Sequence, residues 1–264
     1  MESVGSLFAT EPFSAPGRGA QARTAVVAVH GFTANAFGMR PLGEVLAADG
    51  FQVEVPVLPG HGTRVRDLAA TRYRDWVAAV DELLDDVLAR SQRVVLVGHS
   101  AGGTICLDLA SRRPGDVAGV VAINPFLRRP HHPLGAVAPL IAGLVPFLPR
   151  ELAGMPTNDV ARSDADERAY RFVSTKALAS LLAELPRVRR QLLDLVAPLL
   201  VIRSPQDHTV PPDNALELLE LVGSGDIREL VCERSYHVPQ LDHDADRVEA
   251  AVRAFVADIA GRAR

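Results

Sequence analysis

Residues 94–103 have the sequence VVLVGHSAGG, in which four apolar residues are followed by a Gly-His-Ser-Ala-Gly turn. Ser100 stands between Gly98 and Gly102, each two positions away. A nucleophilic serine on a sharp strand-to-helix turn needs glycines here, because larger side chains would collide with the turn. Gly-rich turns also join strands to helices where no nucleophile is present. The motif by itself therefore leaves a catalytic and a purely structural interpretation open.

Strand and helix patterns alternate along the rest of the chain. Short β-branched runs predict strands within residues 24–32, 51–62, 93–98, 117–125, 197–204 and 226–234. Helical spacing predicts helices at 40–50, 73–90, 101–112, 211–222 and 242–260. This alternation is typical of parallel strands joined by crossover helices. We therefore predict an α/β fold with a mostly parallel central sheet flanked by helices.

The alternation is interrupted in the middle of the chain. From Pro125 to about Pro186 no strand is evident, and prolines, short helical pieces and an apolar run take over. An insertion of roughly sixty residues is too long for a simple loop. We predict that residues 1–124 and 191–264 form the core and residues 125–190 a helical cap over the strand ends. Residues 1–22 are expected to form a loosely held N-terminal arm.

An acid and a histidine follow later strands, in the order that such a serine needs. Asp207 comes just after the strand predicted at 197–204, and His237 just after the strand predicted at 226–234. The carboxyl ends of parallel strands meet at one edge of a sheet, so the three residues are expected to converge. His237 would take the proton from Ser100, and Asp207 would fix the tautomer of the imidazole.

Other titratable residues near these positions are weaker candidates. They are His30, His99, His208, His243, Asp108 and Asp116. We expect His30 to make a structural hydrogen bond and His99, the neighbour of the serine, to face away from it. The two aspartates do not stand at the carboxyl end of a predicted strand.

An oxyanion needs two N–H donors near the serine. One is expected from Ala101, the residue after the nucleophile, and the other from the loop after the first strand, most plausibly from Phe32. Gly31 lets this backbone approach closely.

Composition excludes several classes of protein. The net charge of −4 and the absence of a basic run argue against nucleic-acid binding. Cys106 and Cys232 have no metal-ligand spacing, so we expect no metal and no cofactor, and Cys106 is interpreted as a small buried residue. The N-terminus lacks the pattern of a signal peptide. The apolar stretch at 133–149 is shorter than the ~20 residues of a membrane-spanning helix, so a cytoplasmic protein is expected.

Six motifs in this order resemble the α/β-hydrolase superfamily, and within it bacterial monoacylglycerol lipases and small carboxylesterases. They are HGFTAN (30–35), LPGHGT (58–63), DW (75–76), GHSAGG (98–103), SPQDHTVPPDNA (204–215) and SYHVPQLD (235–242). The resemblance implies a cofactor-independent serine hydrolase with Ser100, Asp207 and His237 as its triad and Phe32 and Ala101 at its oxyanion hole.

The resemblance also implies roles for the cap. The apolar segment 134–148 would line an acyl channel, and an acid within 158–167 would help to hold glycerol. We predict hydrolysis of carboxylic esters with medium-to-long acyl chains, an acylglycerol or similar ester as substrate, and transient contact of the cap with a membrane surface. A thioesterase, a lactonase or a C–C hydrolase could use the same triad, and a non-catalytic receptor is the least favoured alternative. The acyl chain length, the alcohol and the oligomeric state stay open.

Overall fold

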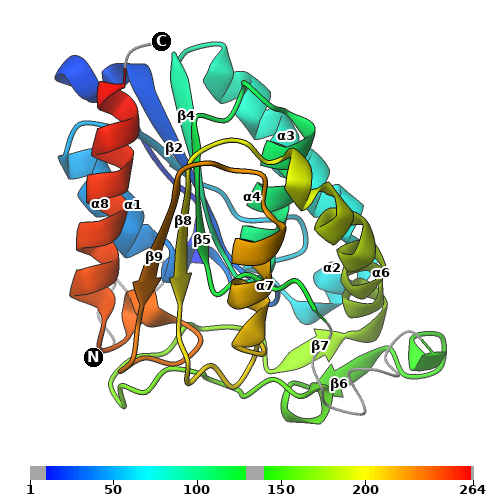
Figure 1. The fold of residues 1–264 in the computed structure, drawn as a ribbon. Coiled ribbons are helices and arrows are strands. Elements are labelled where there is room, and N and C mark those ends of the chain that lie inside the picture. Colours follow the sequence, from blue (N-terminus) through cyan, green and yellow to red (C-terminus); the bar gives the residue numbers. More distant parts are fainter. Residues whose placement is uncertain (1–9, 129–139, 263–264) are drawn as a thin grey trace.

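The fold is built on a seven-stranded sheet, seen nearly edge-on in Figure 1. The computed structural model describes residues 10–128 and 140–262. The strand order is β1-β3-β2-β4-β5-β8-β9. The bounds are β1 Phe13–Ala15, β2 Thr24–Val29, β3 Gln52–Val55, β4 Arg93–His99, β5 Gly119–Ile123, β8 Leu199–Arg203 and β9 Ile227–Val231. All neighbours pair in parallel except β1 and β3, which confirms the predicted mostly parallel sheet.

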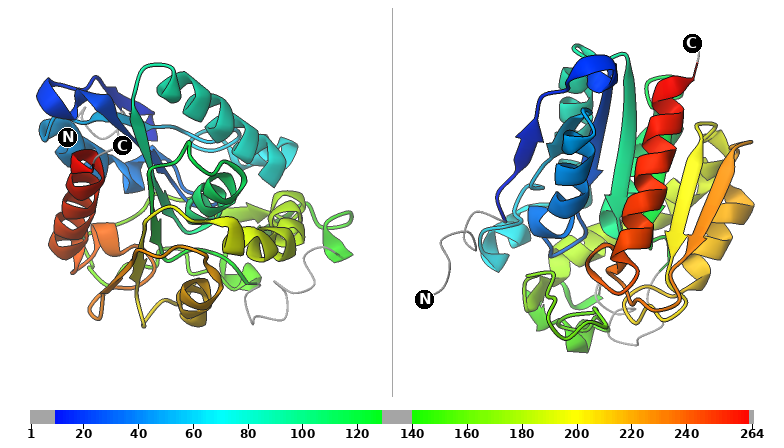
Figure 2. Two further views of the ribbon diagram at one scale, coloured as in Figure 1. Left: turned by 45° about the horizontal axis from the view of Figure 1, so that its top comes forward. Right: turned by 90° about the vertical axis from the view of Figure 1, so that its left-hand side faces the viewer.

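Helices cover both faces of the sheet (Figures 1 and 2). One face carries α1 (Arg40–Ala48) and α8 (Ala245–Gly261). The other carries α3 (Tyr73–Leu88), α4 (Ala101–Arg112), α6 (Thr175–Gln191) and α7 (Asp213–Leu221), and the short α2 (Val65–Ala70) precedes α3. Each of the five helices that the sequence predicts is present within a few residues of its expected bounds. No helix among the described residues combines the length and the apolar character needed to cross a membrane.

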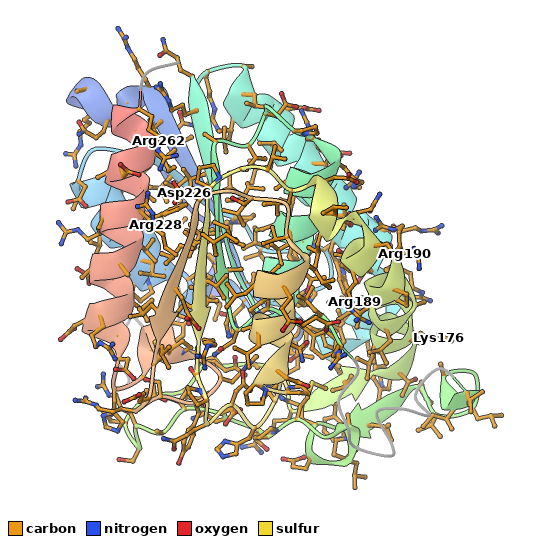
Figure 3. The ribbon with its side chains drawn as sticks, viewed as in Figure 1. Lys176, Arg189, Arg190, Asp226, Arg228 and Arg262 are labelled. Atoms are coloured by element: carbon orange, nitrogen blue, oxygen red, sulfur yellow. The ribbon has the colours of Figure 1, made fainter. Side chains whose placement is uncertain are left out.

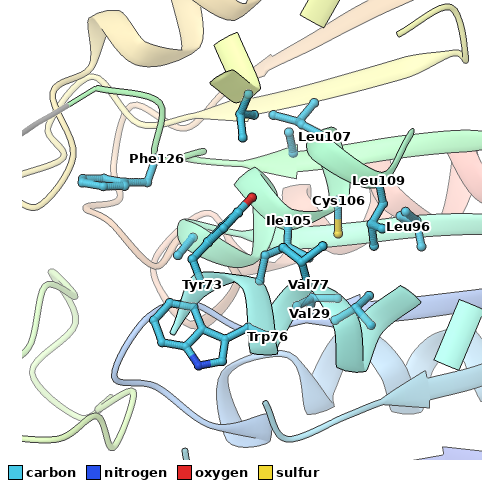
Figure 4. Close-up of a cluster of buried hydrophobic side chains, with 14 of the residues drawn as sticks. Val29, Tyr73, Trp76, Val77, Leu96, Ile105, Cys106, Leu107, Leu109 and Phe126 are labelled. Atoms are coloured by element: carbon cyan, nitrogen blue, oxygen red, sulfur yellow. The ribbon is translucent and has the colours of Figure 1, made fainter. Parts of the chain in front are cut away.

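The central strands are buried on both faces, which explains their unbroken apolar runs. In β2, Val27 and Val29 face the α3 and α4 side, whereas Val26 and Ala28 face the α1 and α8 side. Figure 4 shows the first of these two cores, in which Trp76 is fully buried. β4, which ends at His99 directly before Ser100, is packed in the same way, with Leu96 in the first core and Val97 in the second.

In the described part of the segment between β5 and β8, β6 (Phe147–Pro149) and β7 (Phe172–Ser174) lie at the carboxyl ends of the strands, and α6 continues along one face of the sheet (Figures 1 and 2). The segment also contains the 3₁₀ turn η5 (Glu151–Ala153). The prediction that this segment holds no strand is wrong, because β6 and β7 pair antiparallel. Each has only three residues, too few for an alternating pattern to show, and Pro149 argues against a strand. Residues 129–139, including the start of the predicted channel lining, lie outside the described residues.

Residues 10–23 are attached more firmly than a loose arm. Phe13 pairs with Val55, so β1 adds an antiparallel edge strand to the sheet. The Arg18 N–H donates to the carbonyl of Gly50 over 2.7 Å. A strand of three residues carries too little pattern to be predicted from sequence, and β1 is held by its partner.

Arginine–carboxylate pairs fasten the outer elements, as Figure 3 shows. Arg228 of β9 and Arg262 after α8 both pair with Asp226, which ties the last helix to the edge of the sheet. On the other side, Lys176, Arg189 and Arg190 lie along α6, where Arg189 pairs with Glu217 of α7.

Candidate active site

Ser100 stands on a strained turn between β4 and α4. Its φ of 54° and ψ of −121° lie in a region that residues other than glycine rarely adopt. A Cβ on Gly102 would lie 2.3 Å from the carbonyl oxygen of Val29, and a Cβ on Gly98 would lie 2.4 Å from the carbonyl oxygen of Gly102. Both glycines are therefore needed for steric reasons, as the sequence predicts.

The structure brings the three predicted residues to one place. His237 Nδ1 lies 2.7 Å from Asp207 Oδ2, and Ser100 and His237 line the same cavity. Asp207 follows β8 and His237 follows β9, so the ends of adjacent parallel strands set this pair. The other oxygen of Asp207 accepts hydrogen bonds from the N–H groups of Thr209 and Val210, which fixes the carboxylate toward the imidazole.

Two effects act on the imidazole of His237. Burial by itself lowers the pKa of this group, because a charged ring loses its hydration. The charge of Asp207 and its hydrogen bond outweigh this loss, with smaller contributions from Asp159 and Glu167, so the net pKa of His237 is raised above 6.5. The ring can thus accept a proton and hold it as an imidazolium.

Phe32 and Ala101 stand where the sequence places the oxyanion donors. Both line the cavity beside Ser100. Within residues 10–128 and 140–262, neither backbone N–H donates to any acceptor, so both are free to bind an oxyanion. A Cβ on Gly31 would lie 3.1 Å from Cβ of Ser100, which shows how closely this loop approaches the serine. The assignment of the two donors stays a prediction.

His99 does not face away from the site. Its Nε2 donates to the carbonyl oxygen of His237 over 2.8 Å, and the two rings lie 4.7 Å apart. Asn124, directly after β5, donates from Nδ2 to the same carbonyl over 2.9 Å. The neighbour of the serine ends β4 and points along the edge of the sheet toward the loop after β9, so its expected orientation was wrong. Asn124 is not among the predicted site residues, although a polar residue directly after a strand is a usable signal.

His30 makes the structural hydrogen bond that the sequence predicts. The N–H of Leu58 donates to His30 Nε2 over 3.1 Å, so the proton of the ring sits on Nδ1, which faces the carbonyl of Gly31. Burial lowers the pKa of His30 to about 4, which keeps the ring neutral.

The remaining rivals are engaged elsewhere. His208 pairs with Asp159, and His243 is exposed at the surface. Asp108 is held by Arg187 and Arg112 beneath α6. None of the three side chains lines the cavity at Ser100 in the described part of the chain.

The cavity at Ser100 opens to solvent, spans about 500 Å³ together with that opening, and is lined mostly by apolar side chains. Its apolar lining includes Phe32, Phe126, Met155, Leu178 and Leu181. Its polar side is formed by Arg150 and Glu167, both almost fully buried, with Arg150 Nη2 2.9 Å from Glu167 Oε1. Two further nitrogens of Arg150, Nε and Nη1, have no partner among the described residues. The described part of the predicted channel segment, 140–148, does not reach this cavity.

No cluster of three potential metal ligands occurs among the described residues. Cys106 and Cys232 are free and buried, and Cys106 is fully buried as predicted. Burial raises the pKa of Cys232 to about 12 and that of Cys106 further, so neither is a reactive thiolate at neutral pH.

The sheet, the strained serine turn and the Asp207–His237 pair together define an α/β hydrolase. Residues 20–244 match the family model described as serine aminopeptidase, S33, and the chain belongs to this family. It is 35% identical to a thermostable monoacylglycerol lipase from Bacillus sp. (strain H-257), over 97% of either chain. It is 25% identical to a carboxylesterase from Bacillus subtilis (strain 168), over 88% of this chain and 92% of the relative.

Solved structures agree with this assignment. A structure of the metagenome-derived lipolytic enzymes LipS and LipT superposes with a TM-score of 0.87 at 30% identity, covering 95% of this chain and 98% of that one. The monoacylglycerol lipase of Paleococcus ferrophilus shares the fold, with a TM-score of 0.78 at 24% identity and coverage of 94% and 97%.

Proposed function

We propose that this serine ester hydrolase cleaves carboxylic esters with medium-to-long acyl chains, of the monoacylglycerol type, through an acyl-enzyme on Ser100. One observation carries the proposal. Ser100 and His237, whose ring is held by Asp207, line a mostly apolar cavity that also contains the buried Arg150–Glu167 pair. Such a cavity suits a molecule with an apolar chain and a small polar head.

The contacts of His237 support the following proton movements. Its Nδ1–H donates to Asp207, which leaves Nε2 to take the proton of the Ser100 hydroxyl as Oγ attacks the ester carbonyl. The N–H groups of Phe32 and Ala101 stabilise the oxyanion of the tetrahedral intermediate. The imidazolium then protonates the leaving alcohol, the acyl-enzyme remains on Ser100, and water releases the acid by the same steps in reverse order.

Arg150 and Glu167 are the candidates for recognition of the alcohol. Glu167 is the acid of the 158–167 segment that lines the cavity, and it offers acceptor oxygens. Arg150 offers two nitrogens, Nε and Nη1, that lack a partner among the described residues. Glycerol both donates and accepts hydrogen bonds, so it would satisfy both side chains, and an unpaired buried donor is otherwise costly.

The test is a substrate series. Turnover is measured on p-nitrophenyl esters from acetate to palmitate and on the matching monoacylglycerols, with Ser100→Ala as the control. We expect turnover that rises with chain length, and labelling of the wild type but not of Ser100→Ala by a fluorophosphonate. Folded wild type that neither turns over an ester nor labels would overturn the proposal. A preference for thioesters, lactones or C–C bonds would change the proposed substrate class but leave the proposed triad unchanged.

A second comparison isolates the alcohol. For Glu167→Gln we expect the kcat/KM for a monoacylglycerol to fall by on the order of tenfold or more, because a buried charge-assisted hydrogen bond is lost. The kcat/KM for the methyl ester of the same acid should change little. Equal losses of kcat/KM on both substrates would show that Glu167 does not bind the glycerol.

The cap also carries an exposed apolar face. Leu140 and Leu144 are 80% and 85% exposed, and Leu152 and Phe172 are about half exposed. A lipid aggregate would cover these side chains while the substrate enters. Flotation with phosphatidylcholine vesicles containing monoolein tests this contact. Leu144→Ser should reduce the bound fraction, and an equal bound fraction would contradict the contact.

A further inference from the structure

Two buried carboxylates join the cap to both catalytic loops. Asp159, in the cap, is 3% exposed, and Asp242, after the His237 loop, is 1% exposed. Neither belongs to the Asp207–His237 pair or lines the cavity at Ser100. Their partners show that the cap segment 158–162 is bound to the core from both sides.

Asp159 reaches from the cap to the loop that bears Asp207. Its Oδ2 accepts the N–H of His208 over 3.0 Å and the hydroxyl of Thr209 over 2.8 Å. Its Oδ1 accepts the Nδ1–H of His208 over 2.8 Å. The bonded residues directly follow Asp207, so this carboxylate fixes the backbone that carries the acid of the pair.

Asp242 makes the reciprocal connection from the core. Its Oδ2 accepts the N–H of Ala161 over 2.8 Å and that of Tyr236 over 2.9 Å. Its Oδ1 accepts the N–H of Arg162 over 3.1 Å and that of His243 over 2.8 Å. Two of these donors belong to the cap, and Tyr236 directly precedes His237.

The loop that bears Asp207 and the loop that bears His237 also contact each other directly. The ring of His208 packs edge-on against the ring of Tyr236, with centroids 4.4 Å apart. One short cap segment is thus hydrogen-bonded next to both catalytic residues, at distances where a carboxylate binds strongly. If the segment moved, the spacing between Asp207 and His237 would change with it.

We infer that Asp159 and Asp242 are positioning residues that hold the Asp207 and His237 loops in register through cap segment 158–162. The cap then not only covers the cavity but also helps to set the geometry of the reacting groups, because its position and the positions of the two loops depend on the same hydrogen bonds. The inference rests on the proposed function only for the role of Asp207 and His237.

The experiment compares Asp159→Asn and Asp242→Asn with Asp164→Asn, an exposed acid of the same part of the cap. The kcat and KM on p-nitrophenyl butyrate, the rate of fluorophosphonate labelling and the unfolding temperature are measured for each. We expect kcat and labelling to fall together by up to ~100-fold in the two test variants, since a displacement near 1 Å can cost that much. The KM should stay within about threefold, because the cavity lining is unchanged.

The pH profile adds a second readout for Asp159, beside the separation of kcat from KM. The His237 ring contacts Asp207 and lies 4.7 Å from the ring of His99, and the charges of Asp159 and Glu167 also raise its pKa. Removing the charge of Asp159 should move the acid limb of kcat/KM to lower pH, whereas Asp164→Asn should leave it in place.

Each outcome decides the inference. The inference is overturned if the test variants have the same kcat and the same acid limb as Asp164→Asn. It is also overturned if they change KM alone. Failure of both test variants to fold also overturns it, because the carboxylates are then purely structural. A wild type that neither labels nor hydrolyses an ester overturns the proposed function and the inference together, whereas a reactive wild type with unaffected test variants overturns only the inference.

Discussion

The imidazole of His99 donates from Nε2 to the backbone carbonyl of His237 over 2.8 Å, across a sequence separation of 138 residues. The same carbonyl accepts a hydrogen bond from Asn124. His237 is therefore held at its backbone by residues at the ends of β4 and β5, and at its ring by Asp207 after β8. Neighbouring strands of a parallel sheet thus fix the position of the imidazole as well as its tautomer.

We expect His99→Leu to lower kcat by about tenfold. The variant leaves the His237 carbonyl with Asn124 alone, and loss of one buried hydrogen bond of this kind corresponds to roughly 1–1.5 kcal/mol. His99→Gln keeps a side-chain N–H at a similar reach and should recover most of the rate. Steady-state kinetics on one p-nitrophenyl ester check the pair. A leucine variant as active as wild type would show that Asn124 suffices.

The raised pKa of His237 predicts the acid limb of the pH–rate profile. Burial lowers this pKa and Asp207 raises it by more, so the neutral base is lost at a pH above the ordinary 6.5 as the solution is acidified. In Asp207→Asn the imidazole stays buried but loses the neighbouring negative charge, so the acid limb should move to lower pH. The maximal rate should also fall by on the order of 10⁴-fold, because the tautomer is no longer fixed.

The Asp207–His237 pair also makes the free energy of unfolding depend on pH, and here its contribution is lost as the pH rises. Because the pKa of His237 is higher in the folded than in the unfolded protein, the pair stabilises the fold fully below about 6.5. This contribution is lost as the pH rises through the folded value. Urea unfolding of wild type and Asp207→Asn across this range measures the difference, and parallel stability curves would contradict it.

The predicted triad residues all follow strands that the sequence predicts: Ser100 and Asp207 follow the buried apolar runs of β4 and β8, whereas His237 follows β9, which is partly exposed. Ser100, Asp207 and His237 stand at such positions, and the sheet topology brings them together. The strands β6 and β7 escape prediction because three residues carry no period. Glu167 cannot be singled out among the acids of 158–167, because the path of the chain between Gly154 and β7 decides which acid enters the cavity.

Gly102→Ala should destabilise the protein severely. The new Cβ would lie 2.3 Å from the carbonyl oxygen of Val29 and 2.4 Å from that of His30, both backbone atoms that cannot swing away. We expect a loss of at least about 3 kcal/mol in the free energy of unfolding, at or beyond the upper end of ordinary overpacking. The matched control is Gly225→Ala, where a Cβ would meet nothing within 4 Å. Urea titration compares the two, and similar midpoints would refute the steric argument.

His61 provides a prediction for acid stability that is separate from catalysis. Its ring is 2% exposed and packs edge-on against His30 and Trp76, at centroid distances of 5.1 and 5.3 Å. Burial, with a smaller effect of His30, lowers the pKa of His61 to about 3. The unfolded chain therefore binds a proton at this residue between pH 6.5 and 3 that the folded protein does not bind, and stability falls as the pH falls.

Replacing His61 by phenylalanine should remove this loss. Between pH 7 and pH 5 the wild type should lose about 2 kcal/mol more of unfolding free energy than His61→Phe, the amount that 1.5 pH units below the unfolded pKa correspond to. His30 is present in both proteins and cancels in the comparison. His243→Asn, at an exposed position, should track the wild type. Urea unfolding at the two pH values measures the difference, and equal losses in wild type and His61→Phe would show that His61 is protonated in the folded protein.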